Sequence, residues 1–320
     1  MKLGRNLFKQ FLRNWMLVIA MATGAGIYLT YHFCAALHFL GPALSRTAST
    51  IQPVLLFLML FLTFCKVEPK DLKPQRWHLP LLLIQGGLYT ALSAVLIAFP
   101  DVHLRYGIEA AMLCLICPTA TACAVVTGKL GGNMAGVLSY TILINLLAAI
   151  LIPLLVPLTN PVENLNFAKA SASILSKVFP MLILPCLLAW AIRYFLPKFH
   201  ARLLKYVYVS FYVWALALTL AIAMSTRYII LNENSLSALA VIAAVSLLCC
   251  AFQFFAGKKI GKAHGYGITA GQALGQKNTV FAIWLGYTFF NPIVSVAGGF
   301  YSIWHNCYNT WQLHRVAKKA

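Results

Sequence analysis

Apolar residues fill the chain in long runs, and polar residues gather in the short stretches between them. A helix needs about 20 apolar residues to span a bilayer. By this measure the sequence has ten apolar segments, and the connections between them are too short to fold alone. The segments are 14–33, 48–65, 78–99, 106–128, 133–157, 172–195, 205–225, 236–256, 265–288 and 292–312. We therefore predict an all-α polytopic membrane protein with ten transmembrane helices in a single membrane domain, residues 1–320.

The fourth and ninth segments differ from the others because polar residues and helix breakers interrupt them. Residues 117–123 contain Pro118, which removes a backbone donor, and small polar residues follow it. Residues 271–279 contain two glycines and then an amide, a cation, an amide and a hydroxyl. Neither stretch suits a regular helix that faces lipid, so we predict an interruption in each.

The two interrupted segments lie five helices apart, so each is the fourth member of a five-helix half. An odd number of helices per half makes the second half enter the membrane in the opposite sense. We predict inverted repeats over residues 1–158 and 159–320, with the interrupted helices marking a substrate site at the bilayer midplane. The alternative is that proline and glycine merely kink two packed helices.

Composition and charge agree with a membrane protein. Of 320 residues, 61% are hydrophobic and 10% charged, and the mean hydropathy is +0.80. The net charge of +19 comes from short basic runs between apolar segments rather than from one patch, which argues against nucleic-acid binding. With the N-terminus inside, 19 Lys and Arg residues fall on the inner side and 4 on the outer side. The positive-inside rule then predicts cytoplasmic termini and a cell membrane, for which we expect a bacterial inner membrane.

Lys277 is the most unusual residue inside a predicted span. A lysine at the centre of a spanning helix costs about 2.5–3.5 kcal/mol on insertion scales, so it indicates a functional site. The structural alternative is that Lys277 reaches an aqueous surface or pairs with backbone carbonyls.

Glu109 is the one acidic residue within a predicted span. We place it in the first turn of the fourth segment, as an interfacial carboxylate in preference to a gating or proton-path group.

Four stretches together resemble the bile acid:sodium symporter family. Residues 13–16, Arg-Asn-Trp-Met, open the first helix as in many members. Cys117-Pro118 with Thr121-Ala122 resembles the family's Cys-Pro-Gly-Gly-Thr-Ala-Ser-Asn motif. Residues 275–282 look like its Glu-x-Gly-x-Gln-Asn-Ser-Gly-Leu-Ala motif, and residues 300–306 resemble its C-terminal Phe-Ser-Val-Trp-His-Asn.

This resemblance implies a fold and an activity. The fourth and ninth helices would cross in a core domain, and a panel domain of helices one, two, six and seven would move against it. The activity would be uptake of an organic anion driven by sodium. Bile acids, keto or hydroxy acids and sulfonates are the candidate substrates, and we expect the small-molecule anion and the lipid bilayer as partners of a monomer.

The sequence departs from the family at the sodium sites. The family's sodium-binding glutamate falls at Ala273, its following glutamine at Lys277, and its Ser-Asn pair at Cys123-Ala124. Sodium needs hard oxygen ligands, which thiols and methyl groups do not provide. We therefore expect that the sodium sites are lost, and we predict no metal and no other cofactor.

At the positions that bind substrate in the family, this sequence matches the family motifs better than it does at the sodium-binding positions. Thr121 and Asn278 match the family, and we predict that Thr119, Thr121, Asn278 and Thr279 bind the substrate. Half-helices that begin near Thr121 and Asn278 would direct positive partial charge at an anion.

Lys277 is the predicted coupling residue, with its ammonium in the place of a sodium ion. A buried lysine without a carboxylate neighbour can take up and release protons, so proton coupling is one possibility. We predict a sodium-independent secondary transporter that works by alternating access. The alternative is a sodium symporter that uses backbone carbonyls and hydroxyls such as Thr141.

Enzyme and sensor functions have less support. An intramembrane enzyme would need a paired nucleophile and base, or a metal cluster, at membrane depth, and the sequence shows neither. Cys114 and Cys117 form a C-x-x-C, but they lie one turn apart in an apolar segment and are better explained as packing residues. A sensor usually has a soluble output domain. We predict that the protein is not an enzyme.

Overall fold

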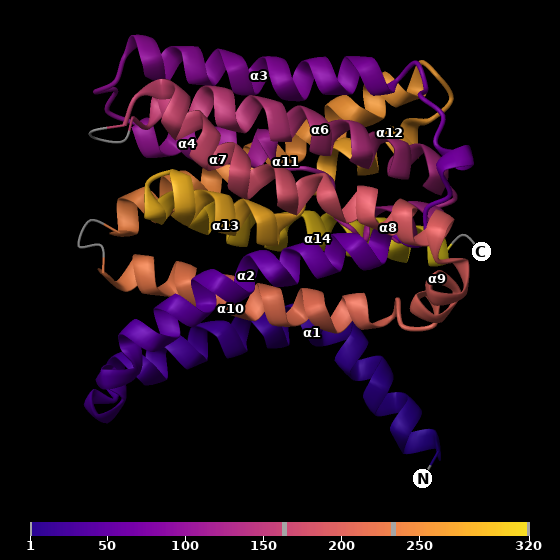
Figure 1. Cartoon of the computed structure of the whole chain (residues 1–320), viewed down its shortest axis with the longest axis horizontal. Helices are drawn as coiled ribbons and strands as arrows, with labels where there is room; N and C mark the ends of the chain where they lie inside the picture. The colour runs from indigo at the N-terminus through magenta and orange to yellow at the C-terminus, as the bar shows by residue number, and fades with distance from the viewer. Residues whose placement is uncertain (1, 162–164, 232–234, 319–320) are drawn as a thin grey trace.

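The computed structural model describes residues 2–161, 165–231 and 235–318. Within these ranges the regular structure is helical, apart from one isolated β-bridge. The α-helices are α1 (Lys2–Phe33), α2 (Gly41–Phe64), α3 (His78–Ala98), α4 (Arg105–Ile116), α5 (Cys123–Lys129), α6 (Met134–Thr159), α7 (Phe167–Leu182), α8 (Leu184–Phe195), α9 (Pro197–Leu204), α10 (Val209–Leu231), α11 (Ser235–Lys262), α12 (Gly267–Gly275), α13 (Thr279–Phe289) and α14 (Val296–Ala317). The 3₁₀ helices are η1 (Ala35–Leu40), η2 (Pro69–Asp71) and η3 (Pro292–Ser295). Most helices run along the long axis of the molecule (Figure 1).

The prediction of a polytopic helical membrane protein agrees with the lengths of these helices. In the described ranges, six helices are long and apolar enough to cross a membrane. A seventh span results if α7 and α8, which meet at an angle of 42°, are counted as one. The further spans needed to reach ten are α14 and the two interrupted pairs. The ten-span count therefore stays a prediction.

The predicted interruptions are confirmed. In the fourth segment α4 ends at Ile116 and α5 begins at Cys123, and in the ninth α12 ends at Gly275 and α13 begins at Thr279. Pro118 lacks the backbone donor that would continue α4.

Several helix limits differ from the apolar segments. α1 starts at Lys2, where an apolar run was predicted only from residue 14, since a helix can continue beyond its lipid-facing part. The short helix α9 was not predicted because it is only eight residues long and its mean hydropathy is low. His200 of α9 is buried, and its Nε2 lies 2.9 Å from the carbonyl oxygen of Cys65, which holds α9 against the end of α2.

One end of the molecule, called here the basic end, holds the loop 65–77, α9 and the loop 263–266. α1 begins and α14 ends at this same end, on the right in Figure 1. Glu68 pairs with Lys70 at 2.6 Å and with Arg193 at 2.8 Å. The hydrogen bond from Lys70 and the charges of Lys70 and Arg193 hold the pKa of Glu68 below its usual value. These ion pairs tie the loop after α2 to the end of α8.

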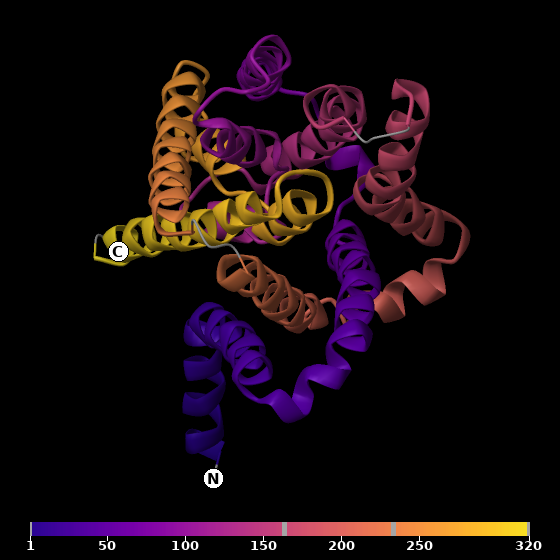
Figure 2. The same cartoon turned by 90° about the vertical axis from the view of Figure 1, so that its left-hand side faces the viewer.

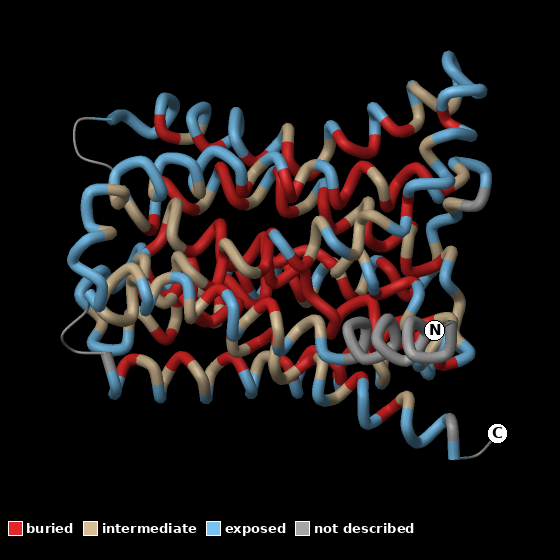
Figure 3. Tube along the Cα trace, turned by 90° about the horizontal axis from the view of Figure 1, so that it is seen from below, coloured by how far each residue is buried: buried red, intermediate tan, exposed pale blue. Residues whose placement is uncertain are grey.

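The helices pack in a continuous bundle. α1 packs on α10, α10 on α2, and α2 on the α7–α8 pair. α7 also packs on α6, α6 packs on α3, and α11 packs on α12 and α4. Figure 2 shows α1, α2 and α10 on one side of the molecule and α3 and α11 on the other. Buried residues concentrate in the middle of the molecule, and the ends of the helices are mostly exposed (Figure 3). Large apolar side chains on the outside, such as Leu83, Leu248 and Phe255, suit contact with lipid.

Candidate functional site

The two helix interruptions meet in the middle of the molecule. Thr119 and Lys277 form an antiparallel β-bridge. The amide of Ala120 donates to the carbonyl oxygen of Gln276 at 2.8 Å, and the amide of Asn278 donates to that of Pro118 at 2.8 Å. The extended segments therefore satisfy each other's backbone groups, which would be costly to leave unpaired away from water.

Side-chain hydroxyl groups donate hydrogen bonds to the carbonyl oxygens at the C-terminal end of α12. The Thr119 hydroxyl donates to the Ala273 carbonyl at 2.8 Å, and the Tyr301 hydroxyl donates to the Gly275 carbonyl at 2.9 Å. A helix C-terminus carries negative partial charge, which a cation or a hydrogen-bond donor can offset. Here neutral hydroxyl groups provide the donors.

Lys277 donates to a carbonyl oxygen at the C-terminal end of α4. Its side chain is 1% exposed, and its Nζ lies 3.4 Å from the carbonyl oxygen of Leu115. Gln85 Nε2 donates to the carbonyl of Cys117, directly after α4, at 3.1 Å. Lys277 forms no ion pair with any described residue. The ammonium therefore faces the negative end of α4 without a neutralising carboxylate.

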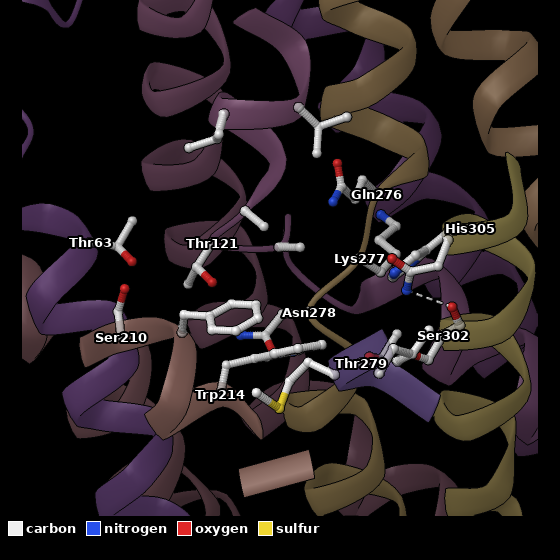
Figure 4. A pocket seen from close by; sticks show the side chains of 18 of the residues that line it. Thr63, Thr121, Ser210, Trp214, Gln276, Lys277, Asn278, Thr279, Ser302 and His305 are labelled. Atoms are coloured by element: carbon white, nitrogen blue, oxygen red, sulfur yellow. Dashed lines mark hydrogen bonds between the residues drawn. The ribbon is translucent and has the colours of Figure 1, made fainter. Parts of the chain in front are cut away.

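A cavity of about 920 Å³ extends from this crossing toward the basic end. Its polar wall includes Thr121, Gln276, Lys277, Asn278 and Thr279 (Figure 4). The facing wall is aromatic and comes from the start of α10 and the segment before it. The residues of that wall are Val207, Tyr208, Ser210, Phe211, Tyr212 and Trp214. Such a cavity suits a ligand with one polar end and an apolar body.

Asn278 serves both the fold and the cavity. Its Oδ1 accepts a hydrogen bond from the amide of Phe281 at 3.2 Å and so caps the N-terminus of α13. The side chain also lines the cavity, which leaves its amide nitrogen as a donor there. The N-terminus of α13 adds positive partial charge at the same place.

The family comparison covers the first interruption and most of the helices. The model of the Sodium Bile acid symporter family matches residues 53–260, more than half of the chain. The chain belongs to this family. No curated protein matches the chain. As a member of the sodium bile acid symporter family with several apolar helices, the protein is a multi-pass membrane protein of a transporter family. The match ends before Lys277. The backbone pairing of the second interruption with the first is therefore an observation that does not depend on the family match.

The predicted substrate residues divide into two groups in this family member. Thr121, Asn278 and Thr279 line the cavity together with Lys277. Thr119 is fully buried, does not line the cavity, and donates its hydroxyl to the carbonyl of Ala273. Its position beside the crossing holds the two segments together.

Sequence reasoning gave too little weight to Gln276, Ser302 and His305. All three line the cavity, and each has a buried polar atom without a hydrogen-bond partner in the described structure: Gln276 Oε1, Ser302 Oγ and His305 Nδ1. The family motif at residues 300–306 was the available signal. A single sequence, however, does not show which face of the last helix points inward.

Glu109 lies in a different environment from the predicted interfacial one. It is in the second turn of α4, is 1% exposed, and pairs with Arg105 at 3.1 Å. Arg105 also donates to the carbonyl of Pro100 at 2.8 Å and to Asn160 Oδ1 at 3.2 Å. The expected helix-terminal carboxylate is thus a buried partner of an arginine, and it does not line the cavity.

Proposed function

We propose that this family member is a secondary transporter of a small organic anion that works by alternating access without sodium. The observation that supports this most strongly is Lys277, a buried ammonium without a carboxylate partner on the wall of a cavity. Charged residues at membrane depth usually serve ion or substrate movement. Membership of a transporter family favours this function over an enzyme or a sensor.

The charge of the cavity favours an anion. None of the residues described as lining it is acidic, whereas Lys277 and Lys66 are basic. The Asn278 amide and the N-terminus of α13 add donors and positive partial charge. A carboxylate or sulfonate placed between Lys277 and Asn278 would have its charge met, while its carbon skeleton would pack on the aromatic wall of α10.

The residues at the family's sodium-binding positions disfavour sodium binding. The position of the family's glutamate is Ala273, whose own carbonyl already accepts from Thr119. The Cys123 thiol lies 3.9 Å from the Thr127 hydroxyl, where the family has an oxygen ligand. A fixed ammonium at Lys277 would also repel a nearby sodium ion. We therefore infer that Lys277 replaces the ion electrostatically.

A sodium symporter remains the alternative within transport. Thr141 is buried in α6 and donates to the Val137 carbonyl at 2.8 Å, so its oxygen still has acceptor capacity. It does not line the cavity with Lys277. Sodium coupling would require further oxygen ligands, which the residues at 123 and 273 do not supply.

For the architecture, we propose ten spans in two inverted repeats, residues 1–158 and 159–320. α1, α2, α7–α8 and α10 would form the panel, and the remaining helices the core. The packing of α1 on α10 and of α10 on α2 supports this division. The basic end would face the cytoplasm, in keeping with the positive-inside rule.

A thermal-shift screen tests the proposal. The purified protein is heated with taurocholate, pyruvate, lactate or taurine, once in sodium chloride and once in choline chloride. We expect one class of anion to raise the melting temperature equally in both salts, because binding stabilises the native state. Stabilisation only in sodium would contradict sodium independence, and no stabilisation by any anion would contradict the proposed ligand class.

A further inference from the structure

A row of buried polar side chains runs along one face of α14. Ser302, His305, Asn309 and Gln312 follow each other at spacings of three and four residues, which places them on one side of the helix. Each is at most 8% exposed. The face of a helix that packs inside a membrane protein is normally apolar or small, so this row requires an explanation.

α12 contributes two glutamines to the same region. Gln272 is fully buried and donates its Nε2 to Asn309 Oδ1 at 2.9 Å. Gln276 follows it by four residues, at the crossing beside Lys277. We call these six residues, Gln272, Gln276, Ser302, His305, Asn309 and Gln312, the polar seam.

Every member of the polar seam has a buried polar atom without a hydrogen-bond partner. These atoms are Gln272 Oε1, Gln276 Oε1, Ser302 Oγ, His305 Nδ1, Asn309 Nδ2 and Gln312 Nε2. They make up six of the fourteen such atoms in the described part of the chain. An unpaired buried group costs about 1–3 kcal/mol. A concentration of them along one helix face points to a shared partner.

The chemistry of these atoms identifies the partner. The two glutamine oxygens are acceptors, the Asn309 and Gln312 nitrogens are donors, and the Ser302 hydroxyl can do both. A bound anion would need only donors, and a bound cation would need only acceptors. Water donates and accepts, and a buried water typically makes about three hydrogen bonds. The mixed set therefore fits a file of water molecules.

The polar seam has one end at Lys277 and the other near the basic end. At the first end, His305, Ser302 and Gln276 share the cavity wall with Lys277 (Figure 4). At the second end, Lys258 Nζ donates to Gln312 Oε1 at 2.8 Å. Lys258 lies one turn before the end of α11, at the basic end.

We propose that the polar seam conducts protons between the aqueous phase at the basic end and Lys277. In the step at Lys277, an N–H bond of the ammonium breaks and its electron pair stays on Nζ. A neighbouring water gains the proton and passes one on along the file. The amine left behind is neutral, so a monovalent anion can move with one proton and without net charge.

The groups around Lys277 suit this role. The titratable side chains whose charge would act on it are Cys114 on α4, Cys117 directly after α4, Cys123 on α5, and Cys249 and Cys250 on α11. His305 on α14 shares its cavity wall, and the rings of Tyr301 and His305 meet edge to face with centroids 5.7 Å apart. None of these groups is a carboxylate that would fix the ammonium permanently in its charged form.

The proposal rests on the proposed anion transport, and one set of experiments separates the two. Protein in liposomes is given labelled taurocholate, pyruvate or lactate, and internal pH is followed with trapped pyranine. Uptake driven by an imposed pH gradient requires net proton movement, whereas counterflow at equal pH exchanges anion for anion. The double variant Gln272→Leu/Asn309→Leu removes both partners of a hydrogen bond together and closes the middle of the polar seam. Cys307→Leu, on an exposed face of α14, is the matched control.

We expect the double variant to lose at least about fivefold of gradient-driven uptake while counterflow stays within about twofold of wild type. Equal gradient-driven uptake in the double variant and the control would overturn the polar seam as a proton route. Wild-type counterflow without any response to a pH gradient would also overturn it, but would leave anion transport standing. No counterflow of any of the three anions would overturn both. If the double variant folds poorly, Gln312→Leu makes the same comparison at the basic end.

Discussion

Lys277 is the residue on which the proposed chemistry of the cavity depends. The side chain is buried, its ammonium meets the Leu115 carbonyl, and it lies on the cavity wall. Burial of a charge opposes folding. We therefore assign the amine to the proposed function of the cavity rather than to the stability of the fold.

This interpretation makes a prediction for Lys277→Gln, which keeps the length and polarity of the side chain. We expect an unchanged or higher melting temperature, because a buried charge is removed, and at least about tenfold weaker anion binding. Melting curves with increasing anion concentration measure both quantities. Lys259→Gln removes an exposed charge and is the control. Unchanged anion affinity in Lys277→Gln would assign the lysine a structural role.

Asn278 allows its two roles to be separated. Asn278→Asp keeps the oxygen that caps α13 but places a negative charge in the cavity, whereas Asn278→Ala removes cap and donor together. We expect Asn278→Asp to keep the stability of the wild type and to lose anion binding. Asn278→Ala should lose anion binding and also about 1 kcal/mol of the free energy of unfolding. Thermal melting with and without anion distinguishes the two variants. Anion binding retained by Asn278→Asp would mean that Asn278 does not face the ligand.

At the scale of the elements, the sequence predicts the interruptions of the fourth and ninth segments correctly. Pro118 and the glycine-rich polar stretch before Thr279 are local signals, because they act on their own backbone. The role of Thr119 is different. Its hydroxyl bonds to Ala273, a residue far away in the sequence, and local patterns do not reveal such a partner. Ser302 and His305 were missed for a related reason, since the inward face of α14 is set by packing.

Close packing of α11 on α12 gives a test at this scale. A Cβ added at Gly275 would lie 2.4 Å from the ring of Phe254, so the ring would have to move. We expect Gly275→Ala to destabilise the fold by about 1–3 kcal/mol, as overpacking does. Gly87→Ala is the control, because a Cβ there meets nothing within 4 Å and alanine favours the helix. Equal melting temperatures for both variants would argue against this close approach.

At the scale of the whole molecule, the apolar pattern predicts the helical membrane fold well. Segments 78–99 and 133–157 match α3 and α6 within two residues at each end. The bend between α7 and α8 was not predicted, although Pro180 in α7 and Pro185 at the start of α8 are local signals for it. The burial of Glu109 depends on which helices pack together, and one sequence does not contain that information directly.

The buried pair of Glu109 and Arg105 lies at the end opposite the basic end, away from the cavity. We expect Glu109→Gln to lower the melting temperature, because Arg105 keeps its charge and loses its ion-pair partner. Anion affinity should stay within about twofold of wild type, since Glu109 does not line the cavity. Melting curves with increasing anion again supply both values. Loss of binding without loss of stability would point to a gating role instead.

The central claim is that Lys277 replaces sodium in an anion transporter. The most direct measurement is anion counterflow in proteoliposomes, with sodium on both sides or with choline in its place. Sodium-independent transport through Lys277 should give equal rates in the two salts for the wild type and a large loss of rate in Lys277→Gln. A wild-type rate that falls steeply when choline replaces sodium would contradict it.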